Sequence, residues 1–300
     1  MRRSAMPPGL TLWNRRPEPS PGSSLKLRHS TEENLHVRWI SINEVTVRVA
    51  IREGTDGRTP LLLLNGIGAG FELLLPFVDA LPETEIIMFD APGAGKSSAP
   101  TLPWRMRNYA KVCKHVLDEL NVPLANVMGV SWGGALAQQF AKQYPERCAR
   151  LVLAATSPGN IMIPGRLAVL LHMSNPRRYY DKKYMKKIAG TIYGGKLRTN
   201  RLSAGKFADL TTPPSKRGYY YQMLAIAGWT SLPWLRRIKQ PTIVLHGDDD
   251  PIIPTMNARL MTSLIPSAKL MVVDCGHLFM LTRARRVATV VKRFFEQVLE

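Results

Sequence analysis

The segment Val127-Met128-Gly129-Val130-Ser131-Trp132-Gly133-Gly134 decides the fold of this chain. It begins as an apolar run and continues into the helical pattern of residues 134–140, and a Gly-x-Ser-x-Gly motif spans the junction. The small residues around Ser131 permit a strained turn that exposes a hydroxyl between a strand and a helix. The motif also occurs by chance in such turns, but a strand before it and a helix after it favour catalysis. We therefore expect Ser131 to be a nucleophile.

Short apolar runs recur along the chain and alternate with helical patterns. Strands that are buried on both faces have this composition, and their alternation with helices is typical of a parallel sheet. The predicted strands are residues 61–64, 86–89, 127–130, 151–155, 243–245 and 270–273, and the predicted helices are residues 106–120, 134–144, 256–264 and 282–299. The sequence therefore predicts an α/β fold with a mostly parallel sheet flanked by helices.

The first strands are predicted to form a hairpin. Val37 and Trp39 alternate with polar residues, Ile40 and Ile42 follow one step out of phase, and further alternation begins after a turn at 43–44. The change of phase predicts a β-bulge where Trp39 meets Ile40.

The chain is predicted to contain one catalytic domain with an insertion. Residues 1–35 are rich in Pro, Ser and Arg without apolar periodicity, so we expect a flexible basic tail. Residues 36–157 and 241–300 form the predicted core region. Residues 158–240 have helical patterns and many aromatic residues, and a structureless loop of that length would be unusual. We expect them to form a helical cap region.

Positive charge is concentrated in the cap region. The whole chain carries a formal net charge of +19, and residues 158–230 hold thirteen Lys or Arg and two acids, a local charge of +11. Such a field attracts anionic surfaces and acidic products. We expect a cluster of basic side chains to hold the protein at an acidic, apolar surface, with a merely solvated face as the alternative; these residues are Arg177, Arg178, Lys182, Lys183, Lys186 and Lys187.

Several classes of protein are not favoured by the sequence. No run approaches the roughly 18 apolar residues of a spanning helix, so we expect a soluble protein without a membrane span. Prolines interrupt the N-terminal segment where a signal peptide would be apolar, so no export is expected. The cysteines are Cys113, Cys148 and Cys275; they form no CxxC pair and have no histidine cluster nearby, so we expect free thiols in the cytoplasm, no metal and no cofactor.

A serine hydroxyl needs a base within hydrogen-bond reach. His277 follows the last predicted strand after a short loop, so the carboxyl end of that strand would place it above the sheet. The other histidines lie in the tail, at the first strand, in a helix, in the cap region or at a strand end, where His246 is expected to pack or to hydrogen-bond. We expect His277 to be the general base.

The acid is expected in the loop after residues 243–245, which holds Asp248, Asp249 and Asp250. Asp250 lies deepest in the loop, Pro251 fixes the backbone after it, and the other two carboxylates suit turns. The oxyanion donors are expected to be the backbone N–H groups of Trp132 and of Ile67, which lies in a glycine-containing loop after an early strand.

With these residues assigned, the sequence resembles intracellular medium-chain-length poly(3-hydroxyalkanoate) depolymerases, a branch of the α/β-hydrolases. The resemblance covers about residues 38–298, cap region included, and is carried by residues 64–68, 129–140, 144–148, 191–195, 228–231, 247–251 and 276–279. It implies the α/β-hydrolase fold, a triad of Ser131, Asp250 and His277, and release of 3-hydroxy fatty acids at cytoplasmic polyester granules. Partners would be the granule surface and granule-coating proteins.

Two other functions were weighed against this one. A general carboxylesterase or lipase would use the same triad, and the aromatic and Met-rich cap region favours a polymer surface instead. A non-catalytic binding protein, attached to nucleic acid through its basic insertion, is disfavoured because nucleophile, acid and base are all present. No nucleic-acid-binding motif is recognisable in the sequence either.

Overall fold

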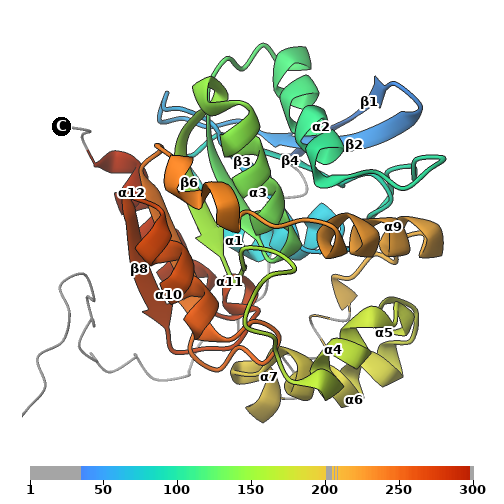
Figure 1. Cartoon of the computed structure of the whole chain (residues 1–300). Helices are drawn as coiled ribbons and strands as arrows, with labels where there is room; N and C mark the ends of the chain where they lie inside the picture. Colours follow the sequence, from blue (N-terminus) through green and yellow to red (C-terminus); the bar gives the residue numbers. More distant parts are fainter. Residues whose placement is uncertain (1–34, 201–204, 206, 208, 298–300) are drawn as a thin grey trace, which may run out of the picture.

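A computed structural model describes residues 35–200, 205, 207 and 209–297. The predicted tail, residues 1–35, lies outside them except for Leu35. The described residues contain an eight-stranded sheet in the order β1-β2-β4-β3-β5-β6-β7-β8 (Figure 1). Strand β2 is antiparallel to β1 and β4, and the pairs from β4 through β8 are parallel.

The strands lie close to the predicted runs. Their bounds are β1 Leu35–Ile42, β2 Val45–Arg52, β3 Leu61–Leu64, β4 Ile86–Phe89, β5 Ala125–Val130, β6 Cys148–Ala154, β7 Thr242–Gly247 and β8 Ala268–Val273. Every residue of β3, β4, β5 and β7 is buried. Helices cover both faces of these strands, which is why the strands need no polar positions.

The predicted bulge in the first hairpin is wrong. Strands β1 and β2 pair without interruption from Leu35↔Arg52 to Ile42↔Val45. The apparent change of phase arises because Val37 and Trp39 are about half exposed, so they belong to no buried face. The turn is as predicted: Asn43 has φ 51°, which suits a two-residue hairpin turn.

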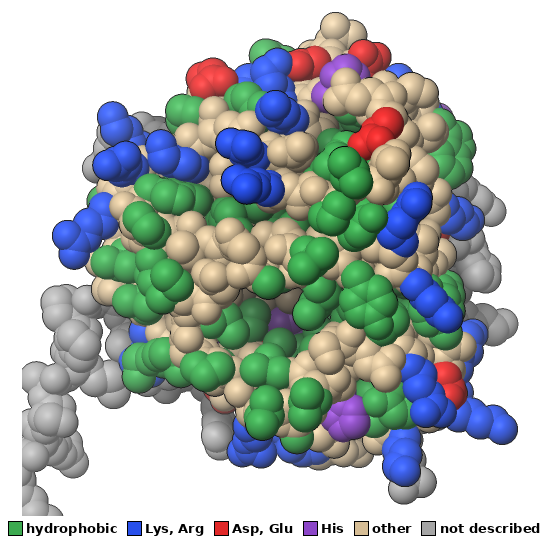
Figure 2. Space-filling model, turned by 45° about the vertical axis from the view of Figure 1, so that its right-hand side comes forward, with side chains coloured by type: hydrophobic (Ala, Val, Ile, Leu, Met, Phe, Trp, Pro, Cys, Tyr) green, Lys and Arg blue, Asp and Glu red, His purple; other side chains and the backbone are tan. Residues whose placement is uncertain are grey.

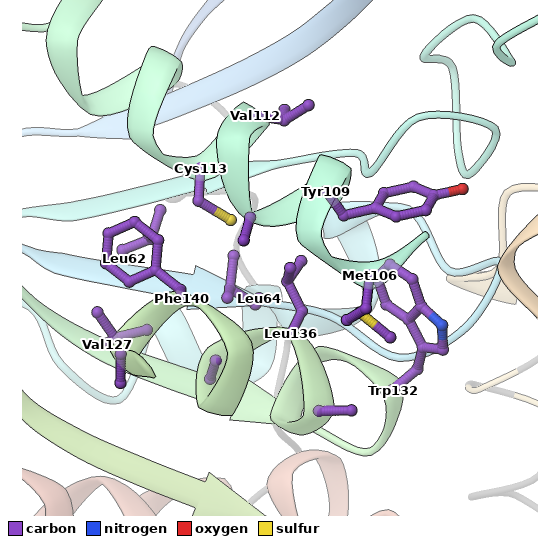
Figure 3. Close-up of a cluster of buried hydrophobic side chains, with 14 of the residues drawn as sticks. Leu62, Leu64, Met106, Tyr109, Val112, Cys113, Val127, Trp132, Leu136 and Phe140 are labelled. Atoms are coloured by element: carbon purple, nitrogen blue, oxygen red, sulfur yellow. The ribbon is translucent and has the colours of Figure 1, made fainter. Parts of the chain in front are cut away.

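Two hydrophobic clusters hold the helices on the sheet. On one face, α2 (Met106–Glu119), α3 (Trp132–Gln143) and α10 (Thr255–Leu264) pack on the strands. Figure 3 shows part of this cluster, in which Phe140 lies beside Leu62 and Val127, and Tyr109 lies near Met106 and Trp132. On the other face lie α1 (Leu75–Val78), α11 (Phe279–Thr282) and α12 (Ala284–Glu296).

The cap region consists of two parts that pack differently. Helices α4 (Leu167–Ser174), α5 (Arg177–Tyr180), α6 (Lys182–Tyr193) and α7 (Lys196–Thr199) lie together below the sheet in Figure 1. The buried side chains of α4, α6 and α7 form a separate small cluster with Ile252 and Ile253, whereas Tyr179 of α5 belongs to the large cluster of the core region. Helix α9 (Lys216–Ala227) and the 3-10 helix η4 (Leu232–Arg237) instead join the large cluster of the core region.

The carboxyl ends of four neighbouring strands meet at one edge of the sheet. In the register, Val130 of β5 lies beside Ala154 of β6, which lies beside Leu245 of β7 and through it Met271 of β8. The loops that follow β5, β7 and β8 therefore leave the sheet side by side. These loops carry the candidate nucleophile, acid and base.

Candidate active site

Ser131 lies in the strained turn that the motif predicts. Its backbone has φ 56° and ψ −116°, and it is the N-cap of α3. Such a conformation costs on the order of 1–3 kcal/mol for a residue other than glycine. Flanking hydrogen bonds fix it: Ser131 N–H donates to the Ala154 carbonyl at 2.8 Å, and the Thr156 hydroxyl donates to the Ser131 carbonyl at 2.7 Å.

Glycine at position 129 is required by the tightness of this turn. A Cβ at Gly129 would lie 2.1 Å from the Gly133 carbonyl oxygen, so any side chain would push the helix away from the strand. Because Ser131 is the last residue before α3, its side chain also lies at the positive end of the helix dipole.

His277 and Asp250 form a buried pair. His277 Nδ1 lies 2.7 Å from Asp250 Oδ2, and the two residues are 3% and 8% exposed. The other carboxylate oxygen of Asp250 accepts the N–H groups of Ile252 at 2.9 Å and Ile253 at 3.0 Å. This leaves Nε2 of His277 as the atom that can exchange a proton with a nucleophile.

The neighbouring acids make other contacts. Asp248 Oδ1 accepts the Cys275 N–H at 2.9 Å. Asp249 is partly exposed and accepts the Gly195 N–H at 2.7 Å and the guanidinium of Arg198 at 3.0 Å. Among the three, Asp250 alone has a recorded contact with His277.

His246 lies next to the Asp250 carboxylate in the protein interior. It is fully buried, its Nε2 lies 2.8 Å from the Ile253 carbonyl oxygen, and the same atom lies 3.6 Å from Asp250 Oδ2. Burial lowers the pKa of His246 below its ordinary value, although the Asp250 carboxylate acts in the opposite direction. The imidazole is therefore neutral near neutral pH and donates to the Ile253 carbonyl, as its predicted packing role requires.

The candidate oxyanion donors lie beside the nucleophile. A Cβ built on Gly66 would be 3.7 Å from the Ser131 Cβ, which brings the loop of Ile67 against the serine. Trp132 is the first residue of α3, and N–H groups in a first helical turn have no acceptor within the helix. The Trp132 ring packs edge-to-face on Tyr109, with centroids 5.0 Å apart. This contact with the core holds residue 132, and with it the backbone N–H, in place.

The cap region holds this oxyanion loop. The fully buried Gln222 of α9 accepts the Gly68 N–H at 2.8 Å, and its carbonyl accepts the Trp132 indole N–H at 3.0 Å. The Tyr179 hydroxyl donates to the Ile67 carbonyl. Sequence reasoning missed Gln222 and Tyr179 as site residues, since neither belongs to a motif with known chemistry.

One predicted surface residue is buried. Arg178, expected among the basic side chains that meet an acidic surface, is 3% exposed and packs among cap tyrosines. It lies under Tyr179, whose ring is 4.4 Å from its guanidinium carbon. Helix α5 begins at Arg177, and its geometry directs the Arg178 side chain into the cap region. Arg178 therefore cannot contribute to binding at an acidic surface. The other five basic side chains are exposed.

One face of the molecule is hollowed and apolar. Figure 2 shows a hollow bordered by hydrophobic side chains, with a histidine deep inside it and most Lys and Arg side chains farther away. Four large side chains at the start of the cap region are 41–73% exposed, and we call them the apolar ledge: Ile161, Ile163, Leu167 and Leu171.

Residues 35–297, apart from the gaps near 201–208, contain no helix long and apolar enough to cross a membrane. Over the same residues, no group of three or more His, Cys, Asp or Glu side chains is arranged to hold a metal ion. All three cysteines are free and buried.

The strained serine, the buried histidine–aspartate pair and the sheet order are those of a serine hydrolase fold. Residues 59–284 match the family described as alpha/beta hydrolase fold, and the chain belongs to this family. The family predicted from the sequence is therefore confirmed.

The chain is also similar to individual proteins over most of its length. The poly(3-hydroxyalkanoate) depolymerase of Ectopseudomonas oleovorans is 49% identical over 261 residues, which cover 87% of this chain and 92% of the relative. A 2-hydroxy-6-oxononadienedioate/2-hydroxy-6-oxononatrienedioate hydrolase of Comamonas testosteroni is 28% identical over 82% of this chain and 91% of its own.

Solved structures show the same fold. The enol-lactonase from Burkholderia xenovorans LB400 superposes with a TM-score of 0.76 at 21% identity, covering 87% of this chain and all of its own. A hydrolase from Pseudomonas aeruginosa PA01 gives a TM-score of 0.74 at 22% identity, over 87% and 98% of the two chains.

Proposed function

We propose that this protein hydrolyses ester bonds of medium-chain poly(3-hydroxyalkanoate) through an acyl-enzyme on Ser131. In this proposal His277 is the general base, Asp250 orients it, and the N–H groups of Ile67 and Trp132 hold the oxyanion. The observation that carries the chemistry is the buried 2.7 Å contact between His277 and Asp250 at the sheet edge where Ser131 begins its helix.

The reaction follows from the groups present. His277 Nε2 takes the proton as Ser131 Oγ attacks the ester carbonyl, and the Asp250 carboxylate stabilises the imidazolium that forms. The oxyanion accepts the two backbone N–H groups. When the tetrahedral intermediate collapses, His277 returns the proton to the departing alkoxide. Water then repeats the sequence on the acyl-enzyme, releasing a carboxylic acid and free Ser131.

The substrate class rests on the extent of the likeness to the Ectopseudomonas depolymerase. Only 39 of the 300 residues fall outside the aligned stretch, so the stretch includes the whole cap region. Many hydrolases share a triad, whereas the cap region borders the substrate. The products would be 3-hydroxy fatty acids, and the protein would act in the cytoplasm at polyester granules, beside granule-coating proteins. Core and cap regions would follow the predicted division at residues 158 and 240.

Contact with the granule is proposed for two surfaces of the cap region. The apolar ledge would lie on the polymer, because a large exposed apolar patch on a soluble protein marks an interaction surface. The exposed charges of Arg177 and of α6 would add attraction to acidic end groups and coats. Part of this charge is neutralised locally, since Arg177 pairs with Asp181 at 2.9 Å and Lys182 with Asp209 at 3.2 Å.

Two substrates test the proposal. Purified protein should release acid from a medium-chain polyester suspension and should also hydrolyse a short-chain nitrophenyl ester, both through Ser131. Hydrolysis of the soluble ester without attack on the polyester would indicate a general carboxylesterase. No hydrolysis of either, with no labelling by a serine-directed phosphonate, would overturn the chemistry.

A further inference from the structure

The end of α6 in the cap region lies directly against the loop that carries His277. The His277 N–H donates to the Tyr193 carbonyl at 2.8 Å, and the Tyr193 ring stacks on the imidazole, with centroids 6.2 Å apart and planes 23° apart. Gly276 permits this approach, because a Cβ there would overlap the Tyr193 carbonyl oxygen. Both the backbone and the ring of His277 therefore rest on one cap residue.

The same cap segment also holds the acid loop. The Gly195 N–H donates to Asp249 Oδ2 at 2.7 Å, and Arg198 of α7 donates to the same carboxylate. Asp249 directly precedes Asp250 in the chain. The segment from Tyr193 to Arg198 thus contacts both loops of the candidate acid–base pair, one from β7 and one from β8.

Arg178 fixes Tyr193 from its other side. The guanidinium donates to the Tyr193 hydroxyl at 2.5 Å and to the Tyr219 hydroxyl at 3.2 Å. Burial raises the pKa of Tyr193, so its hydroxyl is a neutral phenol. Through Tyr179, which stacks on Arg178 and donates to the Ile67 carbonyl, this network also reaches the oxyanion loop.

This guanidinium is buried without a carboxylate partner among the residues that the structure describes. Removing a charge from water is costly unless good contacts replace the solvent. Here phenol oxygens and the Tyr179 ring face replace it. These contacts lie within the cap region, and they hold the side chains through which the cap region contacts His277 and Ile67.

We propose that Tyr193 is a positioning residue for His277, and that Arg178 holds Tyr193 in its stacked place. The inference rests on the proposed function, since it assigns His277 as the base. The cap region is then a fixed part of the catalytic arrangement, and substrate enters through the hollow without the cap lifting from His277.

The test compares Tyr193→Leu and Tyr193→Phe with Tyr180→Leu, an exposed cap tyrosine that contacts neither loop. On a short soluble nitrophenyl ester, Tyr193→Leu should lower kcat by about 10- to 100-fold, because a base displaced by about 1 Å loses that much rate. KM should change less than about threefold, since the ester is small. Phosphonate labelling of Ser131 should slow in parallel with kcat.

The phenylalanine variant separates positioning from folding. It keeps the ring and the carbonyl contact and loses the bond from Arg178, so its kcat should lie above that of Tyr193→Leu and several-fold below that of the wild type. Wild-type kcat and labelling rate in folded Tyr193→Leu would overturn the proposal. If leucine prevents folding, Tyr193→Phe and Arg178→Lys decide: both should lower kcat several-fold at unchanged KM, and wild-type kcat in both would overturn it. An inactive, unlabelled wild type would instead refute the proposed function.

Discussion

The core and cap regions of this molecule are held together by different means. The core region buries two large hydrophobic clusters on the two faces of one sheet. The part of the cap region from α4 to α7 has one small cluster, which includes Ile252 and Ile253 of the loop after β7. It also makes polar contacts with the loops of the candidate site: Tyr193 to His277, Gly195 to Asp249 and Tyr179 to Ile67. Hydrophobic burial therefore fixes the core region, whereas the cap region meets the candidate site through a small apolar cluster and directed hydrogen bonds together.

Exposure differs between the two regions as well. Of the twelve large hydrophobic side chains that are exposed in the described part of the chain, seven lie between residues 158 and 240. The cap region exposes apolar side chains to water and also contacts the loop of His277. We infer that this exposed surface contributes to substrate binding more than to the stability of the fold. We expect substitution of the candidate nucleophile to have the largest effect, and substitution of the buried His246 the smallest.

Ser131→Ala should abolish catalysis while the fold is retained. We expect kcat on a soluble ester to fall by about four to six orders of magnitude, because nucleophile and base act as a unit. The melting temperature should fall little, and phosphonate should label no other serine. Ser263→Ala, at an exposed serine of α10, is the control. Hydrolysis by Ser131→Ala near the wild-type rate would rule out the mechanism.

Asp250→Asn should be far more damaging than the same change at the two preceding acids. The amide cannot stabilise the imidazolium, so kcat should fall by about a thousandfold to ten-thousandfold. Asp249→Asn should cost about tenfold or less, through its contact with Gly195 in the cap region, and Asp248→Asn less still. The measurement is kcat on a soluble ester for all three. A larger loss in Asp249→Asn would mean that the acid is displaced by one residue.

Neutralising five exposed basic residues of the cap region should affect only the insoluble substrate. Changing Arg177, Lys182, Lys183, Lys186 and Lys187 to Gln should weaken binding to polyester granules by about tenfold at low salt, and the difference should shrink at high salt as charges are screened. Hydrolysis of a soluble ester should change little. Arg178 stays unchanged because it is buried.

The control for this variant removes equal charge from exposed positions of the core region, namely Lys111, Arg259, Lys269, Arg285 and Arg286. Equal weakening in the control would mean that net charge alone acts. Unchanged granule binding of the cap variant at low salt would show that these charges do not contribute to binding. The apolar ledge would then be the remaining candidate for the contact surface.

His246 should give a small, pH-dependent contribution to stability. Its folded-state pKa is lowered by burial, so below about pH 6.5 the unfolded chain takes up a proton that the folded chain resists. Stability from this residue is complete above that pH and is lost as the pH falls. His246→Gln keeps a donor toward the Ile253 carbonyl. In this variant the free energy of unfolding, measured by denaturant titration, should fall less between about pH 7 and pH 5 than in the wild type. The same decrease in the variant and the wild type would contradict a lowered pKa for His246.

Much of the core region could be predicted from local sequence, because a strand covered on both faces is apolar throughout. The predicted strands at residues 61–64 and 86–89 match β3 and β4 at both ends. In the hairpin of β1 and β2, only the predicted bulge was wrong, because β1 is exposed on both sides where the bulge was expected. The glycines around Ser131 predicted its turn for a local reason as well, since backbone approach permits no side chain there.

The supports of the site could not be predicted in this way. Tyr193, Gln222 and Arg178 act through neighbours far along the chain, and a tyrosine or glutamine in a helix has no local pattern that reveals such a partner. Charge counting treated Arg177 and Arg178 alike, although one faces water and the other faces three tyrosines. Only the packed geometry separates them. The triad and oxyanion roles and the division into core and cap regions remain predictions.

The pairing of β6 with β7 has a consequence for how the enzyme matures. These parallel strands are neighbours in the sheet, although residues 155–241 separate them in the chain. Contacts between such distant residues form late, because a long loop must close first. A chain emerging from the ribosome can shape the turn at Ser131 before β7 and β8 exist. The candidate acid and base, Asp250 and His277, arrive with about the last sixth of synthesis, so we expect no esterase activity from the nascent chain until its final strands dock.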